Sequence, residues 1–268
     1  MELFHKILVT SSKGGIGKST VALGVAAALS REGRRVLLVD CDAGNRCLDL
    51  MLGVEDAVLY DLSDVYEDRC AAEQVFLSCP NLPNLVFCAA PADPFSDLDK
   101  ERLSRALNAL ATASHAEFVI CDTAGLGDTV RAIAADFADG ALIVATQQPA
   151  SIRSAERTAM FVEEMGGIPA RLIISCFEER AAEDGIRAGL IEIIDGTHVR
   201  TLGVVPKDRT LLLAQETGRM PGEKSRAGTA FANIAKRILG DGMPCQFTVV
   251  RLTPIVKLFV EVFGIKLV

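Results

Sequence analysis

The feature that most constrains the fold is a glycine-rich loop between a short apolar run and an Ala-rich segment. Residues 11–20 read SSKGGIGKST, directly after the run Ile7–Thr10 and before the stretch Ser19–Glu32. Between a strand and a helix, such a loop turns backbone N–H groups toward phosphate oxygens at the helix N-terminus. The sequence therefore predicts a phosphate-binding loop at the carboxyl end of a buried strand. It fits the pattern G-x-x-x-x-G-K-[ST] except at Ser12.

The loop supplies groups that suit a nucleotide and its magnesium ion. The phosphates are expected to meet the backbone of Gly14, Gly15, Ile16 and Gly17. Lys18 is expected to reach the β- and γ-phosphates, Ser19 to bind Mg²⁺, and Thr20 to bond the α-phosphate. These groups complete a site within one chain, so the second lysine, Lys13, has no necessary role in a monomer.

Short apolar runs alternate with helical patterns along the chain. The runs suit strands buried on both faces of a parallel sheet, and they comprise Ile7–Thr10, Val36–Asp40, Leu85–Ala89, Phe118–Asp122, Ala141–Thr146, Leu172–Cys176 and Leu202–Val205. The helical patterns are Ser19–Glu32, Asp97–Ala113, Ser151–Met165 and Ala227–Leu239. This alternation predicts an α/β fold, a P-loop NTPase with a doubly wound, mostly parallel sheet flanked by helices.

Two regions depart from the alternation. Residues 41–84 are the least regular and predict short helices and loops over the sheet edge. Residues 240–244 indicate a stop, after which the chain continues as the apolar run FTVVRLTPIVKLFVEVFGIKLV. We therefore expect two parts, a P-loop ATPase domain over residues 1–242 and an apolar C-terminal tail over residues 243–268.

Acidic residues end two of the predicted strands, where ligands bind in doubly wound sheets. Phe118–Asp122 has the form of a Walker B strand, whose Asp122 would hold Mg²⁺ through water. Asp40 and Asp42 end another strand, and the alternative for this pair is a role in a turn or a helix N-cap. Residues 123–127 form a Gly-containing loop, a candidate switch for sensing the γ-phosphate. All of these positions are expected to converge on one crevice.

Composition restricts the remaining possibilities. The net charge of −7 argues against coating nucleic acid through the overall field, so no sequence-specific nucleic-acid binding is expected. None of the eight cysteines forms a C-x-x-C pair, which favours reduced structural thiols in a cytoplasmic protein. The guanine-reading motif N-K-x-D is absent. ATP and Mg²⁺ are therefore the expected cofactors, and phosphoanhydride hydrolysis is the expected reaction.

These motifs resemble those of a known family. Residues 13–20, KGGIGKST, resemble the deviant Walker A motif KGGxGK[ST] of the MinD/ParA ATPases. Residues 36–53, VLLVDCDAGNRCLDLMLG, are similar to the D-x-D-x-G-x-R-N-L-D-L segment of the MinD branch, with Cys47 at the usual Asn. Residues 118–124 resemble the family's Walker B, and residues 203–208, GVVPKD, resemble its G-V-[IV]-P-x-D segment. The similarity covers roughly residues 3–240.

The resemblance implies roles that the motifs alone do not. In this family the extra lysine, here Lys13, reaches across an ATP-dependent sandwich dimer to the partner's nucleotide. Other implied roles are catalysis for Lys18 and Asp42, the latter by orienting the attacking water, Mg²⁺ support for Asp40 beside Ser19 and Asp122, and adenine contact for Pro206 and Asp208. Ser175 or Cys176 stands where many members carry an adenine-contacting Asn, which leaves base selectivity open.

After Pro254 the tail has the pattern of an amphipathic helix. On a helical projection Lys257, Glu261 and Gly264 share one narrow face, and apolar side chains crowd the other. MinD-branch proteins end in such a helix, so residues 254–268 are expected to bind membrane phospholipid reversibly, peripheral to the inner face of the cell membrane. Dimerisation would strengthen this attachment by avidity. The alternative is that the tail packs on its own core or on a partner chain, and its β-branched content also suits a strand.

The leading functional hypothesis is a membrane-cycling ATPase that dimerises with ATP and places the division site. Its expected partners are a division inhibitor and an ATPase-activating protein. The alternative is a ParA-type or flagellar-placement ATPase that positions another cargo. An iron–sulfur carrier of this fold would need cysteines that bridge a dimer or a C-terminal C-x-x-C pair, and no such pair is present. Intact Lys18, Ser19, Asp42 and Asp122 argue against a non-hydrolysing scaffold.

Overall fold

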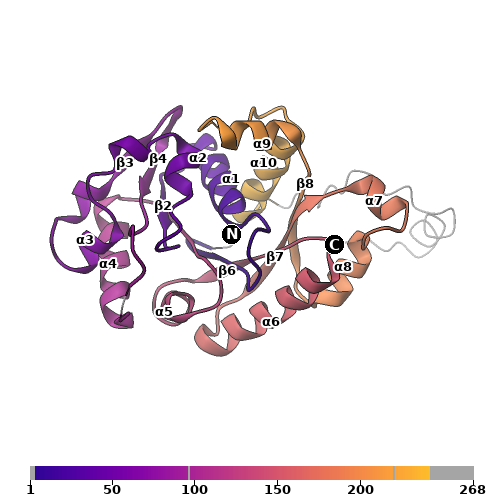
Figure 1. The fold of residues 1–268 in the computed structure, drawn as a ribbon, viewed down its shortest axis with the longest axis horizontal. Helices are drawn as coiled ribbons and strands as arrows, with labels where there is room; N and C mark the ends of the chain where they lie inside the picture. Colours follow the sequence, from indigo (N-terminus) through magenta and orange to yellow (C-terminus); the bar gives the residue numbers. More distant parts are fainter. Residues whose placement is uncertain (1–3, 96, 220, 242–268) are drawn as a thin grey trace.

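An eight-stranded sheet forms the centre of the computed structural model, which describes residues 4–95, 97–219 and 221–241. The strand order is β3-β4-β2-β5-β1-β6-β7-β8 (Figure 1). The bounds are β1 Lys6–Thr10, β2 Val36–Asp40, β3 Leu77–Cys79, β4 Leu82–Cys88, β5 Phe118–Asp122, β6 Gly140–Ala145, β7 Ala170–Phe177 and β8 Thr201–Pro206. Every neighbouring pair is parallel except β3 with β4. The predicted doubly wound, mostly parallel sheet is confirmed.

Helices cover both faces of this sheet. The longer ones are α1 Lys18–Arg31, α4 Lys100–Ala113, α5 Asp128–Asp136, α6 Pro149–Gly166, α8 Leu190–Thr197, α9 Arg209–Glu216 and α10 Arg226–Ile238. The short ones are α2 Leu48–Leu52, α3 Leu62–Tyr66, α7 Glu179–Glu183 and the 3₁₀ turns η1 Glu55–Ala57 and η2 Ala72–Val75. In Figure 1, α1, α2, α9 and α10 lie on one side of the sheet, and α4, α5, α6 and α8 lie on the other.

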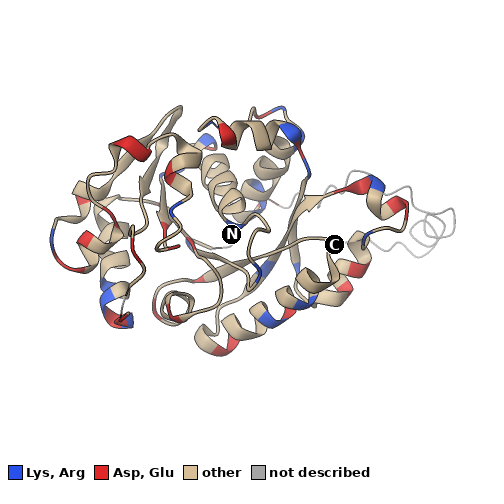
Figure 2. Ribbon diagram, viewed as in Figure 1, with Lys and Arg blue, Asp and Glu red and all other residues tan. Residues whose placement is uncertain are grey.

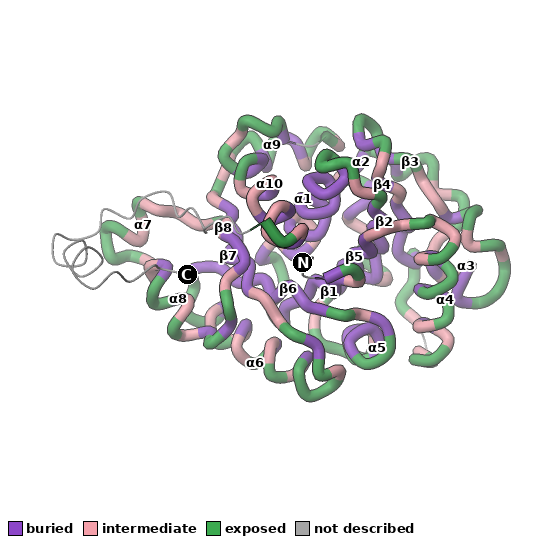
Figure 3. Tube along the Cα trace, turned by 180° about the vertical axis from the view of Figure 1, so that it is seen from behind, coloured by how far each residue is buried: buried purple, intermediate pink, exposed green. Residues whose placement is uncertain are grey.

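The strands divide the interior into two apolar layers. On β1, Ile7 and Val9 belong to the layer under α1, whereas Leu8 belongs to the layer under α4, α5 and α6. This follows from the pleat, because successive side chains of a strand point to opposite faces. Strands β2, β5 and β6 are buried at every residue (Figure 3), which explains why their sequences are continuous apolar runs.

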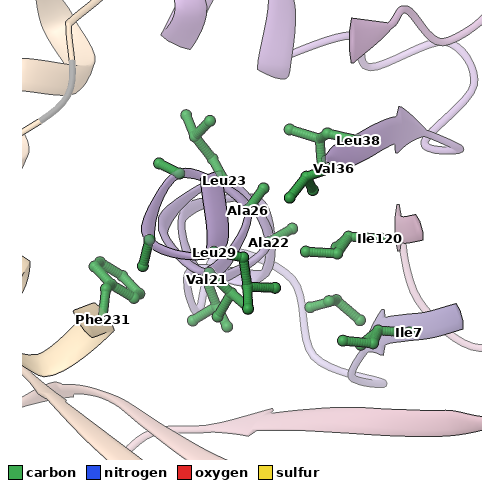
Figure 4. Close-up of a cluster of buried hydrophobic side chains, with 14 of the residues drawn as sticks. Ile7, Val21, Ala22, Leu23, Ala26, Leu29, Val36, Leu38, Ile120 and Phe231 are labelled. Atoms are coloured by element: carbon green, nitrogen blue, oxygen red, sulfur yellow. The ribbon is translucent and has the colours of Figure 1, made fainter. Parts of the chain in front are cut away.

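Helix α1 is enclosed between the sheet and α10. Its residues from Val21 to Ser30 are all buried, and Figure 4 shows Phe231 of α10 against one side with Ile7 and Ile120 of the sheet on the other. Gly24 makes this packing possible, because a Cβ there would lie 2.3 Å from the Phe231 ring. The core therefore fixes the helix that follows the glycine loop.

Of the two regions that depart from the alternation, only residues 41–84 lie entirely within the described part of the chain. Residues 41–84 form α2, α3, two 3₁₀ turns and the edge strand β3, in agreement with the prediction of short helices over the sheet edge. Strand β3 was not predicted, because three residues carry too little periodicity. Helices α5, α7, α8 and α9 were missed for the same reason, being only five to nine residues long. The predicted tail, residues 243–268, lies outside the described residues.

Removing the Phe231 ring should destabilise the fold strongly. Phe231 is only 2% exposed and fills the space beside Gly24, so Phe231→Ala leaves a cavity expected to cost about 3–5 kcal/mol of unfolding free energy. Urea unfolding followed by circular dichroism measures this. Leu213→Ala, at a 65% exposed leucine on α9, is the control and should change stability by less than about 0.5 kcal/mol. Equal effects of the two changes would contradict the described packing.

Candidate nucleotide-binding site

The glycine loop borders a cavity of about 790 Å³ between the start of α1, the segment after β2 and the end of α9. Five loop residues line it: Gly15, Gly17, Lys18, Ser19 and Thr20. The facing walls include Asp42, Cys47 and Gln215. A cavity of this size and polar lining suits a nucleotide.

Two glycines give the loop its shape. Gly15 and Gly17 have φ of 69° and 92°, in the left-handed region that other residues rarely adopt. A Cβ at Gly17 would also lie 2.9 Å from Ser175 Oγ, at the end of β7. Gly17 is the N-cap of α1, so the free N–H groups of the first helical turn border the cavity.

The two lysines of the loop have different environments. Lys18 is buried, and its Nζ donates to the carbonyl oxygen of Lys13 at 3.3 Å. Lys13 is half-buried, and its Nζ donates to Oε1 of Gln148, the N-cap residue of α6. The loop also contacts α6 through Ser12, whose N–H donates to Thr158 Oγ1 at 3.1 Å. Lys18 thus belongs to the cavity, while Lys13 points away from it toward α6.

Two buried carboxylates lie on adjacent strands beside Ser19. Asp40 and Asp122 are register partners on β2 and β5, with 1% and 0% exposure. Burial and the nearby Asp122 raise the pKa of Asp40 to about 8. Burial raises the pKa of Asp122 to about 7, against the opposing influence of the Ser19 hydroxyl and the Lys18 ammonium. Neither oxygen of Asp122 has a hydrogen-bond partner among the described residues.

These residues fit a magnesium ion that enters with a nucleotide. An unpartnered buried carboxylate next to a serine hydroxyl offers the hard oxygen ligands that Mg²⁺ prefers. Within residues 4–95, 97–219 and 221–241, no three His, Cys, Asp or Glu side chains group closely enough to hold a metal ion. Mg²⁺ does not need such a cage, since it usually keeps waters and binds one or two protein groups plus phosphates. Ser19 and Asp122 would hold the ion. Asp40, the register partner of Asp122 on the adjacent strand, would support them.

The segment after β2 connects the carboxylates to the cavity. Asp42 lines the cavity; its N–H donates to Asp40 Oδ1 at 2.9 Å, and its Oδ2 accepts from Asn45 Nδ2 at 3.1 Å. Cys47 donates from Sγ to Ser19 Oγ at 3.2 Å. Burial raises the pKa of Cys47 to about 11, so the thiol remains protonated and can donate at neutral pH. The alternative, a role for Asp40 and Asp42 in a turn or a helix N-cap, accounts for these hydrogen bonds but not for the position of Asp42 in the cavity wall.

Two contacts to the loop helix were not predicted. Gln215 of α9 donates from Nε2 to Thr20 Oγ1 at 2.6 Å, although no motif marks Gln215. The sequence marks Cys47 only as a departure from the family's Asn, and the fold places its Sγ 3.2 Å from Ser19 Oγ. Both residues come from segments far from the loop in sequence, so only the fold brings them to it.

The residues predicted to contact adenine lie outside the lining of the cavity. Pro206 and Asp208 are not among the residues that line the cavity. The Asp208 carboxylate caps α9 by accepting from the Thr210 N–H at 2.8 Å, and it accepts from the Ala227 N–H at 3.0 Å. Ser175 packs against Gly17, and Cys176 is exposed. Contact of these residues with a base stays a prediction.

A parallel sheet with a GKST loop after its central strand and an acidic strand end beside it defines a P-loop nucleotide-binding protein. A family model described as the CobQ/CobB/MinD/ParA nucleotide binding domain matches residues 7–221. The chain belongs to this family. The resemblance that the sequence motifs indicated is therefore confirmed.

Individual relatives favour the MinD branch over the ParA-type alternative. The chain is 33% identical over 247 residues to the septum site-determining protein MinD of Bacillus subtilis (strain 168), covering 90% of this chain and 91% of the relative. A chain of the MinC:MinD cell division protein complex of Aquifex aeolicus superposes with a TM-score of 0.82 at 27% identity, covering 90% of this chain and 98% of that chain. The MinD of Pyrococcus horikoshii OT3, solved with Mg-ADP, shares the fold with a TM-score of 0.70 at 22% identity, covering 87% and 95%.

The raised pKa of Asp40 predicts how stability depends on pH without nucleotide or Mg²⁺. Its pKa rises from 3.8 to about 8 on folding, so the folded state binds more protons than the unfolded state between these values. Unfolding free energy should therefore fall as pH rises from about 4 to about 8. Asp40→Asn, which mimics the neutral acid, should be more stable than the wild type at pH 8 and lose that advantage near pH 4.

Thermal unfolding over this pH range checks the prediction. Asp56→Asn, at an exposed carboxylate, is the control and should follow the wild-type curve. If Asp40→Asn is less stable than the wild type at pH 8, the carboxylate does not carry the predicted electrostatic cost.

Proposed function

We propose that this chain is a Mg²⁺-dependent ATPase that dimerises with ATP, cycles on and off the membrane, and places the division site. The observation that carries the proposal is the loop with two lysines in different environments: Lys18 at the cavity and Lys13 directed away from it. The similarity to septum site-determining MinD proteins over 90% of the chain supports the cellular role. A division inhibitor is an expected partner, since a MinC:MinD complex is among the solved relatives.

Each site residue has a role in this proposal. The N–H groups of the glycine loop and Lys18 hold the phosphates, and Ser19 and Asp122 hold Mg²⁺, which neutralises phosphate charge when bound. Asp42 faces the cavity and orients the water that attacks the terminal phosphorus. Lys13 leaves Gln148 and reaches the nucleotide of the partner chain. Hydrolysis then removes the phosphate that holds the dimer together and separates the two chains.

The charge distribution bears on the ParA-type alternative. Residues 55–105 contain eleven Asp or Glu and four Lys or Arg, a net charge of −7 that equals that of the whole chain. In Figure 2, red segments of the ribbon mark acidic residues on α3 and the loops beside it. The remainder of the chain is neutral overall. The net charge of −7 alone would suggest that the whole protein is repelled by anionic lipid or DNA, but the surfaces outside residues 55–105 are not repelled in this way. The choice of a membrane over DNA therefore rests on the relatives and on the apolar tail.

Membrane attachment is proposed for residues 254–268. Within the described part of the chain, no helix has both the length and the apolar character needed to cross a bilayer. An interfacial helix supplied twice by a dimer would give reversible, ATP-dependent attachment to the inner face of the cell membrane. An ATPase-activating partner would then control release.

Lys13→Ala should separate nucleotide binding from hydrolysis. Because Lys13 points away from the cavity, the variant should bind ATP as the wild type does, yet fail to dimerise. Hydrolysis should fall by about 10²–10³-fold, the usual loss when one charge-stabilising group is removed from a transition state. Light scattering with ATP measures dimerisation, and phosphate release measures hydrolysis. Lys100→Ala, at an exposed lysine on α4, is the control. Normal dimerisation of Lys13→Ala would contradict the role of Lys13.

Sedimentation with anionic liposomes tests the membrane cycle. The wild type should pellet with ATP but not with ADP, because only the dimer presents two tails. Asp42→Ala should pellet at least as well, since it dimerises without hydrolysis, and a chain truncated before Pro254 should stay in the supernatant. Equal pelleting with ADP, or ATP-dependent binding to DNA in place of liposomes, would refute the proposal.

A further inference from the structure

Cys47 lies where the segment after β2 meets Ser19, the serine proposed to bind Mg²⁺. It is the residue before α2, it lines the cavity, and its Sγ lies 3.2 Å from Ser19 Oγ. The contact joins the segment after β2 to the first turn of α1.

The contact restricts how the Ser19 hydroxyl can orient. A serine oxygen has two lone pairs and one proton. The Cys47 thiol donates to one lone pair. Asp122 lies beside Ser19, and its oxygens accept no hydrogen bond within the described structure, so they offer an acceptor for a Ser19 proton that is turned away from Cys47. One lone pair of Ser19 then remains for a cation, and so does the second oxygen of Asp122.

The backbone segment that carries Cys47 is held by the buried carboxylate of Asp40. Asp40 Oδ1 accepts from the Asp42 N–H at 2.9 Å, and Oδ2 accepts from the Leu48 N–H at 3.4 Å. These two bonds tie down both ends of the segment that carries Cys47. Because Asp40 is only 1% exposed, it gives this segment a firm anchor in the core. The contact between Cys47 Sγ and Ser19 Oγ is therefore a fixed part of the site.

We propose that Cys47 is a positioning residue for Mg²⁺, acting by orienting the Ser19 hydroxyl toward Asp122 and leaving one lone pair for the ion. The inference rests on the proposed Mg²⁺–nucleotide site and deepens it. Cys47 does not touch the nucleotide in this role, so removing its thiol should weaken Mg²⁺ binding without weakening the contact between loop and phosphates.

Mg²⁺ titrations in the presence of fluorescent ADP test this with the full chain. Cys47→Ala should raise the Mg²⁺ concentration needed for half-maximal enhancement of ADP affinity about three-fold, the effect of one weak hydrogen bond. ADP affinity measured in EDTA should not change. Cys47→Ser, which keeps a donor, should restore most of the Mg²⁺ response, and Cys70→Ala is the matched control at a half-buried cysteine away from the cavity.

Alkylation gives a second readout that does not depend on turnover. Mg²⁺ with ADP should slow the modification of Cys47 by N-ethylmaleimide, followed by mass spectrometry, and leave Cys70 unchanged. An unaltered Mg²⁺ requirement in Cys47→Ala, or equal losses of ADP affinity with and without Mg²⁺, would overturn the inference. If Mg²⁺ has no effect on ADP affinity even in the wild type, the proposed Mg²⁺–nucleotide site itself fails.

Discussion

The enclosure of α1 is the constraint on which the rest of the structure depends. The sheet contacts one side of this helix and α10 contacts the other, with Phe231 accommodated by Gly24. A helix buried on all sides cannot rotate, so its first turn presents Lys18, Ser19 and Thr20 to the cavity in a fixed direction. The packing of the core thus sets the geometry of the phosphate site, and a change far from the cavity would displace it.

The core stabilises the fold, whereas the buried carboxylates of the site destabilise it. Asp40 and Asp122 lie on adjacent strands, and burial opposes the charge of both. A site of this kind costs stability at neutral pH until a cation supplies the missing opposite charge. Ligand binding and folding stability are therefore coupled, because a ligand that binds only the folded state stabilises it.

The sequence predicted what local pattern encodes and missed what only the fold brings together. Continuous apolar runs identified seven of the eight strands in the described part of the chain. The Gly-Lys-Ser-Thr run with Asp40, Asp42 and Asp122 identified residues that meet at one end of the sheet. Gln215 and Gln148 carried no signal, since a single glutamine on a helix or at its start has many uses. Their contacts to Thr20 and Lys13 depend on how α9 and α6 pack, which local sequence does not specify.

The partner of Lys13 has a physical consequence for assembly. Gln148 is a neutral amide, and among the described residues Lys13 forms no ion pair. A lysine held by an amide keeps its full positive charge, whereas a carboxylate partner would neutralise it. Exchanging the amide for a phosphate of a second nucleotide replaces a hydrogen bond to a neutral acceptor with one to an anionic acceptor, which adds the attraction between opposite charges. In the proposed dimer, Lys13 would therefore give up its contact with Gln148 for a stronger one.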